Sequence, residues 1–214
     1  RDYNGIFPIR GKFINVKKAS YNKLSNNIEF NHIIRILGLE PNKKYTTINQ
    51  LRYGRMMILT DADDDGRHIK GLLICLIHSF WPELLNIEGY ICTINTPVVK
   101  LSKGSKIIPF YNLTDLEKWK STNNVKGWKE KYYKGLGTSK PEEAKEYFKQ
   151  LDELTASYYS KNKKKTEKAI TLAFGNDKKN INQRKEWINN NVIPLNCTEK
   201  KITYKDFINK DLIL

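Results

Sequence analysis

Histidine, cysteine and methionine are scarce in this sequence, which has three histidines, three cysteines and two methionines among its 214 residues. The cysteines Cys75, Cys92 and Cys197 are far apart, and none belongs to a C-x-x-C pair. This spacing gives no sign of a disulfide framework or a cysteine-based metal motif, so we expect reduced, structural cysteines of an intracellular protein. The histidines are also dispersed, and they predict no metal cluster of their own.

Acidic residues are in clear deficit, because 23 Asp and Glu stand against 38 Lys and Arg and give a formal net charge of +15. A polyanion is the natural partner of a chain with such an excess. The sequence also lacks any apolar run near the roughly 20 residues that cross a membrane, so no membrane partner is expected. The hydrophobic fraction of 39% still supports a packed core, in one large domain or two small ones.

One short acidic stretch, D-A-D-D-D-G, begins at Asp61. It follows an apolar run at 55–59 that predicts a buried strand, and it precedes helical spacing of apolar residues at 69–80. Asp61, Asp63 and Asp65 are therefore expected at the sheet edge where ligands bind in α/β folds. Carboxylates this close repel one another by several kcal/mol per pair, and a hard divalent cation relieves that repulsion. The pattern predicts a Mg²⁺ site that also takes a phosphate.

Two other interpretations compete with this metal site. An EF-hand loop also begins D-x-D-x-D-G, but it needs a glutamate at its twelfth position, where this chain has the apolar Leu72. A solvated acidic turn that caps the next helix needs no metal, because aspartate is favourable at helix N-termini. The strand before the turn and the helix after it favour the metal site. Asp64 is expected to point away from its neighbours and is left out of the site, whereas His68 has two open roles, a phosphate or carboxylate contact and a simple hydrogen-bonded first-turn histidine.

The remaining sequence predicts alternating helices and strands. Helices are expected at 30–37 with a stop at Gly38, at 113–121, at 141–151 after a capping box from Ser139 to Glu142, and over most of 161–190. Strands are expected at 1–16, 55–60, 97–101, 106–111 and 128–133, the third and fourth joined as a hairpin through K-G-S. The lysine run at 161–165 has a solvated loop as its ordinary interpretation.

Several motifs, taken together and in order, are similar to those of one known family. They are F-P-I-R-G-K at 7–12, L-R-Y-G-R at 51–55, D-A-D-D-D-G-R-H-I-K-G-L-L at 61–73, Y-Y-K-G-L-G-T-S at 132–139, R-K-E-W at 184–187 and T-Y-K-D-F-I-N-K at 203–210. In this order they closely resemble the DNA-cleavage core of type IIA DNA topoisomerases, in the eukaryotic topoisomerase II branch. The likeness covers essentially the whole chain, and the acidic motif and Y-K-G-L-G are highly specific in combination.

The resemblance implies an α/β, Rossmann-like TOPRIM fold that lacks its first strand, with a helical and hairpin extension leading into a winged-helix domain. The implied limits are a TOPRIM metal-binding domain at 1–125, a mostly helical C-terminal extension at 126–200 and the start of the winged-helix domain at 201–214. Because the chain begins at Arg1 and ends in mid-pattern at Leu214, we expect it to be an excerpt of a longer polypeptide.

The resemblance also assigns roles to individual residues. Asp61, Asp63 and Asp65 match the family's D-x-D-x-D motif, which holds Mg²⁺ at the scissile phosphate, and Mn²⁺ or Ca²⁺ are expected to replace Mg²⁺ in binding. An element beside the cleaved strand matches Pro8 and its neighbours, and a loop close to the metal site matches Y-K-G-L-G. Duplex DNA is therefore expected to contact Arg10, Gly11, Lys12, Asn15, Lys134, Gly135 and Gly137.

Two parts of the family's active site are expected outside this chain. The family's glutamate lies in an E-G-D segment, which does not occur here, and its nucleophilic tyrosine belongs beyond Leu214. No catalytic residue is therefore expected here besides the metal site, and the fragment alone is expected to be inactive. The chain also departs from the family at Arg67, where a small residue is usual; its charge could pair with phosphate or face solvent.

The parent enzyme implied by the resemblance is an ATP-dependent DNA topoisomerase. It would act on double-stranded DNA as a homodimer, and it would bind ATP outside this chain. Its location would be the nucleus, or the cytoplasm if the source is viral.

Two alternatives to this function remain. A non-catalytic basic nucleic-acid-binding module explains the charge, but it gives no task to carboxylates, which repel nucleic acid unless a metal fills them. Other TOPRIM proteins, such as primases and nucleases, share the acidic motif but are not expected to share Y-K-G-L-G or T-Y-x-D-F.

Overall fold

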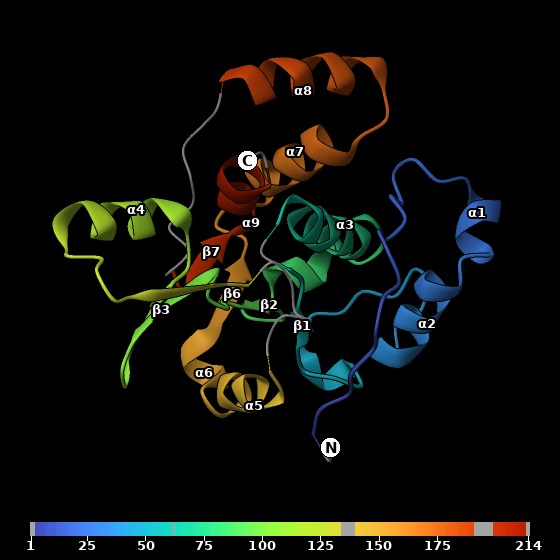
Figure 1. Cartoon of the computed structure of the whole chain (residues 1–214). Helices are drawn as coiled ribbons and strands as arrows, with labels where there is room; N and C mark the ends of the chain where they lie inside the picture. Colours follow the sequence, from blue (N-terminus) through green and yellow to red (C-terminus); the bar gives the residue numbers. More distant parts are fainter. Residues whose placement is uncertain (1–2, 62, 134–139, 191–198, 213–214) are drawn as a thin grey trace.

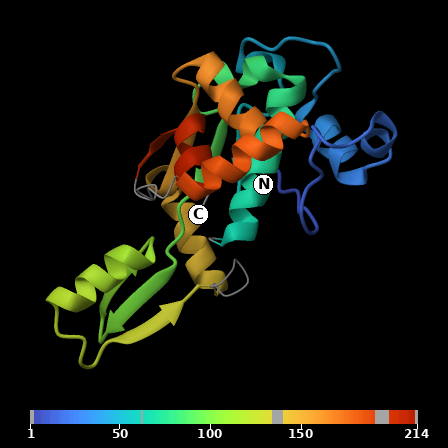
Figure 2. The ribbon, with the colours of Figure 1, turned by 90° about the horizontal axis from the view of Figure 1, so that it is seen from above.

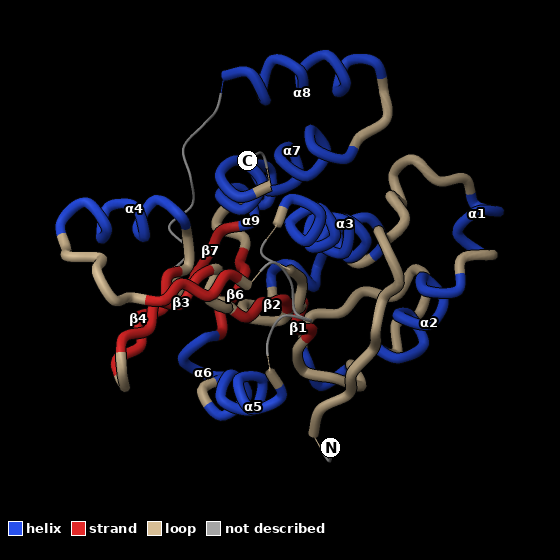
Figure 3. Tube along the Cα trace, viewed as in Figure 1, coloured by secondary structure: helices blue, strands red, loops and turns tan. Residues whose placement is uncertain are grey.

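A four-stranded mixed sheet lies at the centre of the computed structural model (Figures 1 and 3). Its strands, in spatial order, are β1 (Met56–Ile58), β2 (Ile91–Ile94), β6 (Thr155–Tyr159) and β7 (Lys201–Thr203). β1 pairs parallel with β2, β2 pairs antiparallel with β6, and β6 pairs parallel with β7. The expected α/β class is confirmed. The structure describes residues 3–61, 63–133, 140–190 and 199–212.

Helices cover both faces of this sheet. In Figure 1, α3 (Asp64–Phe80) and α7 (Lys163–Phe174) lie on one side, and α5 (Pro141–Lys149) and α6 (Leu151–Leu154) lie toward the other. All four residues of β2 are buried, as expected for a strand that is covered on both faces. The main hydrophobic core therefore lies between the sheet and its helices, and α3 contributes most of its length to it.

The strand, acidic turn and helix expected around the D-A-D-D-D-G stretch are confirmed, with β1 at Met56–Ile58 and α3 at Asp64–Phe80. The middle of α3, from Leu72 to Ile77, is buried throughout. Burial of each aliphatic side chain of this kind stabilises the folded state by about 1.5–3 kcal/mol relative to its exposure to water. This burial fixes α3 against the sheet and so fixes where its N-terminus lies.

The N-terminal part contains α1 (Tyr21–Ser25) and α2 (Ile28–Leu37), and α2 ends at Gly38 as expected. The strand expected at 1–16 is wrong, because the described residues from Tyr3 onward form no strand there. Their alternating apolar pattern has no partner strand to pair with.

A second, smaller sheet has the order β4 (Lys106–Phe110), β3 (Val99–Lys103) and β5 (Lys129–Tyr132), with α4 (Leu113–Thr122) packed on it. The hairpin expected around K-G-S is confirmed, since β3 and β4 pair antiparallel. A separate small core supports this unit, formed by Val99, Leu101, Phe110 and Leu116. Figure 2 shows the unit projecting from the body that contains the larger sheet.

The C-terminal part returns to the larger sheet. Besides α7, it contains α8 (Lys178–Asn190), α9 (Tyr204–Asp206) and the π-helical turn η4 (Phe207–Asp211). Short 3-10 turns also occur earlier in the chain, namely η1 (Ile48–Gln50) and η2 (Pro82–Asn86). The extension expected to be mostly helical therefore also supplies a central strand, β6.

Two features of this C-terminal part were not expected. The lysine run interpreted as a loop instead enters α7, because Asn162 caps that helix by accepting a hydrogen bond from the Lys165 amide at 3.0 Å. The segment expected to begin a winged-helix domain adds β7 to the sheet, and Tyr204 and Phe207 are fully buried in the main core. The winged-helix interpretation of 201–214 stays a prediction.

No helix in the described part of the chain combines the length and the apolar character needed to cross a lipid bilayer.

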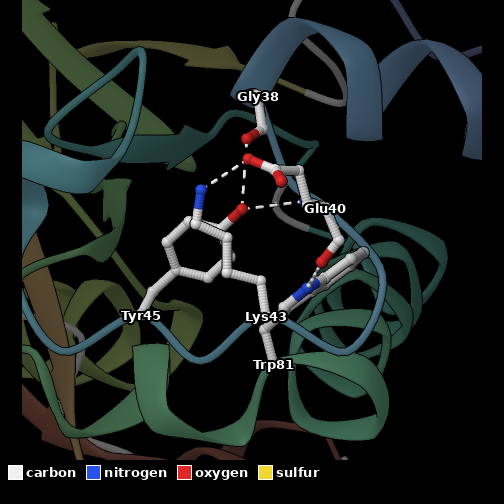
Figure 4. Close-up of polar contacts among 5 residues, drawn as sticks. All are labelled: Gly38, Glu40, Lys43, Tyr45 and Trp81. Carbon is white, nitrogen blue, oxygen red and sulfur yellow. Dashed lines mark hydrogen bonds and ion pairs between the residues drawn. The ribbon is translucent and has the colours of Figure 1, made fainter.

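A buried tyrosine and a buried tryptophan hold the loop that follows α2 (Figure 4). The Tyr45 side chain is 0% exposed, and its hydroxyl accepts a hydrogen bond from the Glu40 amide at 2.8 Å and donates one to the Gly38 carbonyl at 3.2 Å. Trp81, directly after α3, donates from Nε1 to the Glu40 carbonyl at 2.9 Å. The loop after α2 is therefore fastened to the helix that carries the acidic turn.

We expect Tyr45→Phe to lower the free energy of unfolding by about 1–3 kcal/mol, because it removes the buried hydroxyl that accepts from the Glu40 amide and donates to the Gly38 carbonyl. Chemical denaturation monitored by circular dichroism measures this loss. Tyr21→Phe is the matched control, since Tyr21 is 83% exposed. Equal stability of the two variants would contradict the role assigned to the Tyr45 hydroxyl.

Candidate metal and DNA-binding site

The acidic turn begins at the end of β1, which a buried side chain holds in place. Thr93 on β2 donates from its hydroxyl to the Ile58 carbonyl at 2.9 Å. Asp61 is partly buried beyond this point, whereas Asp63 and Asp65 are exposed at the start of α3. The three aspartates thus lie at the strand-to-helix junction expected from the sequence.

Asp63 is the N-cap of α3. Its Oδ1 accepts a hydrogen bond from the Gly66 amide at 2.8 Å, while its backbone carbonyl accepts one from the Arg67 amide at 3.0 Å. The capping interpretation therefore holds for this residue. It does not exclude a metal, because an ionised carboxylate has two oxygens with several acceptor positions.

Gly66 is needed because the turn folds back very closely on itself. A Cβ atom at this position would lie 2.0 Å from the backbone oxygen of Asp61, far inside any real contact. The final glycine of D-A-D-D-D-G is therefore required by the geometry of the backbone. This close approach places Asp61 beside the first turn of α3.

A lysine of the N-terminal segment reaches the same turn. Lys12 Nζ lies 2.7 Å from Asp65 Oδ1, with 53% and 67% of the two side chains exposed. Gly11, just before it, has a φ of 64°, a left-handed conformation that favours glycine. Arg10 is exposed. The structure thus brings Lys12, a residue expected to bind DNA, to an aspartate expected to bind metal.

Asn15, also expected to bind DNA, uses its side chain within the chain. Its Nδ2 donates to the Phe174 carbonyl at the end of α7 at 3.1 Å, and its Oδ1 accepts from the Lys17 amide at 3.0 Å. This pairing anchors the N-terminal segment beside α3. Its contact with DNA stays a prediction, as do those of Lys134, Gly135 and Gly137, which lie outside the described residues.

His68 packs against an aromatic ring. Its imidazole is stacked on Phe174, with ring centroids 6.2 Å apart and an interplanar angle of 10°. Burial and the nearby charge of Lys12 lower its pKa below the ordinary value, although Asp65 acts in the opposite direction. This packing was not among the roles expected for His68, and its contact with phosphate or carboxylate and its first-turn hydrogen bond both stay predictions.

Arg67 contacts two carboxylates. Its Nη2 lies 3.2 Å from Asp64 Oδ1, and its Nε lies 3.7 Å from Asp211 Oδ1 in η4. Burial raises the pKa of Asp211, against the opposing charges of Lys70 and Arg67. The Arg67 side chain is 22% exposed, and it joins the start of α3 to the C-terminal turn η4.

The aspartates of the turn fit a hard divalent cation. Among the residues that the structure describes, no three His, Cys, Asp or Glu side chains lie close enough to hold one metal ion. Mg²⁺, however, is usually held by one or two carboxylates, with water and phosphate as the remaining ligands. Asp65 already binds a cation, the ammonium group of Lys12. The oxygen donors therefore suit such an ion, and the participation of Asp61, Asp63 and Asp65 together stays a prediction.

No motif in the sequence predicts the charged cluster around Glu143 on α5. The Glu143 carboxylate accepts hydrogen bonds from Lys131 Nζ at 2.6 Å, from the Lys140 amide at 2.9 Å and from the Tyr133 hydroxyl, and Lys100 Nζ lies 3.5 Å away. Burial alone would raise its pKa, but these hydrogen bonds and charges outweigh burial and lower the pKa to about 2. Glu143 therefore joins α5 to the smaller sheet.

The capping box expected from Ser139 to Glu142 is displaced by one residue. Lys140 is the N-cap, Pro141 is the first helical residue, and Glu143 accepts the Lys140 amide. Proline favours the first helical position, which sets this register. Glu143 is thus in contact with residues that directly precede and follow the segment 134–139.

We expect Gly66→Ala to lower the free energy of unfolding by at least about 1–3 kcal/mol, because the added methyl group collides with backbone rather than with a movable side chain. Thermal and urea unfolding measure the loss. Gly54→Ala is the control, because the nearest atom to its new Cβ would be Ile48 Cδ1 at an ordinary 3.7 Å. Similar stability of both variants would contradict the close approach at Asp61.

We expect Glu143→Gln to lower the free energy of unfolding at neutral pH by about 1.5–3 kcal/mol, the range for hydrogen bonds to charged groups. The folded-state pKa of Glu143 lies below its ordinary 4.5, so its contribution is complete above that value and is lost as the pH falls through about 2. The stability difference from wild type should therefore shrink between pH 4.5 and 2. Denaturation across this range, with Glu142→Gln at an exposed neighbour as control, checks it; a difference that does not change with pH would contradict it.

Comparison with known proteins gives consistent matches over the whole chain. Residues 1–97 match the model of the Toprim domain, and residues 94–214 match the C-terminal associated domain of TOPRIM. The full chain is 48% identical to "DNA topoisomerase 2" of Arabidopsis thaliana and 46% identical to "DNA topoisomerase 2-alpha" of Gallus gallus. It spans 15% of the length of each of these relatives.

A solved structure gives the same result. The crystal structure of the Plasmodium falciparum topoisomerase II DNA-binding, cleavage and re-ligation domain superposes with a TM-score of 0.91 at 43% sequence identity. The match covers 97% of this chain and 28% of that one. The chain therefore belongs to the family of the C-terminal associated domain of TOPRIM, which here follows a Toprim domain, and it is similar along its length to part of the eukaryotic type II DNA topoisomerases.

Proposed function

We propose that this chain is the metal-holding part of the DNA breakage-and-rejoining core of a type II DNA topoisomerase. One observation carries the proposal: the chain superposes over 97% of its length on a topoisomerase II DNA-binding, cleavage and re-ligation domain at 43% identity. The acidic turn supports it, because Asp63 and Asp65 present exposed carboxylates at the sheet edge beside Lys12. A non-catalytic basic nucleic-acid-binding module would assign no function to these carboxylates.

We infer that the divalent cation is Mg²⁺ and that Asp61, Asp63 and Asp65 provide its protein ligands, with Mn²⁺ or Ca²⁺ able to replace it in binding. A bound cation of this kind neutralises charge on the phosphate oxygens during transfer. The chain's own residues hold and orient the site. Gly66 allows the turn to fold back, and the cap at Asp63 fixes its carboxylate relative to α3.

Basic side chains beside the turn would hold the DNA duplex. Lys12 and Arg10 are exposed on the N-terminal segment, and cations of this kind fix the position of DNA through its phosphates without reading its sequence. The net charge of +15 favours the same partner. Lys134, Gly135, Gly137, Gly11 and Asn15 are proposed as further DNA contacts.

The nucleophile is proposed to lie outside this chain. Several tyrosines, among them Tyr45, Tyr90, Tyr158 and Tyr204, are buried in the core, so their hydroxyls have no access to a DNA phosphate. The tyrosine and the family's glutamate would complete the site from elsewhere in the parent protein. The parent is proposed to be an ATP-dependent, homodimeric, nuclear enzyme, because its relatives are eukaryotic DNA topoisomerases 2.

We expect Asp63→Asn and Asp65→Asn, each in the full-length parent protein, to reduce Mg²⁺-dependent DNA cleavage at least about a hundredfold and to leave most DNA binding intact. Asparagine caps helices as well as aspartate does, so Asp63→Asn should remove charge without loss of the cap. Asp64→Asn is the matched control, because Asp64 pairs with Arg67 and lies outside the proposed site. Plasmid cleavage and DNA-binding assays measure both effects.

Two outcomes would contradict the proposal. Normal cleavage by both variants would remove the aspartates from the metal site. DNA affinity that only weakens as Mg²⁺ is added at fixed ionic strength would favour the passive basic module, because Mg²⁺ then acts solely as a competitor for phosphate.

A further inference from the structure

Lys12 is held at the acidic turn by its neighbours in the chain as well as by its own contact. Gly11 makes a left-handed bend directly before it, and the Phe13 side chain directly after it is buried in the main core with 4% exposure. Asn15 then fastens the segment to the carbonyl of Phe174 at 3.1 Å. The pair between Lys12 and Asp65 is therefore built into the path of the backbone.

Each member of this pair faces a competing partner at the proposed site. Lys12 is a compact point charge that also suits a DNA phosphate. Asp65 is a hard oxygen ligand that also suits a divalent cation. In the structure they neutralise each other at 2.7 Å, and both side chains are more than half exposed, so their contact can open without disturbing the core.

We propose, on the basis of the proposed function, that Lys12 exchanges partners and thereby couples DNA binding to metal binding. A DNA phosphate draws the Lys12 ammonium group away from Asp65, and the released carboxylate becomes available to the cation. The overall charge balance is kept, because the duplex replaces Asp65 as the partner of Lys12 and the cation replaces Lys12 as the partner of Asp65. Coupling of this kind is reciprocal, so each ligand raises the affinity for the other by the same factor.

The size of the effect follows from the exposure of the pair. Exposed ion pairs contribute little free energy, and the corresponding change in affinity is about two- to fivefold. Removing the charge of Lys12 should therefore raise the affinity of the DNA-free protein for the cation by that factor. It should also reduce, by the same factor, the gain in DNA affinity that the cation produces.

The test uses the full-length protein that contains this chain, as wild type, Lys12→Gln and Lys18→Gln. Lys18 is the matched control, because it is an exposed lysine of the same segment and forms no ion pair with Asp65 in the structure. Isothermal titration with Mn²⁺ measures cation affinity without DNA. Fluorescence anisotropy of a short labelled duplex, with Mg²⁺ or with EDTA at matched ionic strength, measures the coupling.

The expected result is tighter Mn²⁺ binding and a smaller Mg²⁺-dependent gain in DNA affinity for Lys12→Gln, each beyond the change seen with Lys18→Gln. The effect of Lys12→Gln on Mn²⁺ binding should disappear when Asp65→Asn is also present. If Lys12→Gln and Lys18→Gln behave alike while Asp63→Asn still weakens Mn²⁺ binding, partner exchange is overturned and the proposed metal site survives. If Mn²⁺ binding is indifferent to Asp63→Asn and Asp65→Asn, both proposals fall.

Discussion

The close approach of the first turn of α3 to the backbone of Asp61 is the constraint on which the site depends. A side chain at Gly66 would come within 2.0 Å of the Asp61 oxygen, so this path of the chain exists only with glycine there. The approach brings an aspartate that follows β1 next to aspartates that begin α3. Strand, turn and helix thus act as one unit, and the burial of α3 from Leu72 to Ile77 holds that unit against the sheet.

The acidic turn carries negative charge, whereas the whole chain is positively charged. The protein carries a net charge of +15, yet four aspartates lie within five residues at the start of α3. The structure offsets their mutual repulsion with the helix N-terminus, with Lys12 on Asp65 and with Arg67 on Asp64. These exposed contacts are individually weak. They therefore neutralise the turn in the folded protein while leaving its carboxylates open to a stronger cation.

The sequence predicted the parts of this structure that depend on neighbours along the chain. The acidic turn and its helix, the hairpin at K-G-S and the end of α2 at Gly38 all rest on local periodicity and turn chemistry. Contacts between distant segments were not predictable in this way. The pairing of Lys12 with Asp65 and the contacts of Glu143 with Lys100, Lys131 and Tyr133 come from elements that fold together only in three dimensions. The apolar alternation near the N-terminus led to the wrong prediction of a strand at 1–16 for the same reason, because a strand forms only where a partner strand is present.

Strand β6 shows how far tertiary context decides the fold. Its sequence, T-A-S-Y-Y, has no aliphatic run, yet it lies between β2 and β7 with Ala156 and Tyr158 almost completely buried. Hydrogen bonds to strands on both sides and aromatic packing of Tyr158 on Tyr204 and Phe207 supply what its own propensity lacks. The region matched by the C-terminal associated domain thus completes the sheet whose first strand leads into the acidic turn. The two matched domains share one core, so the position of the aspartates depends on the folding of both.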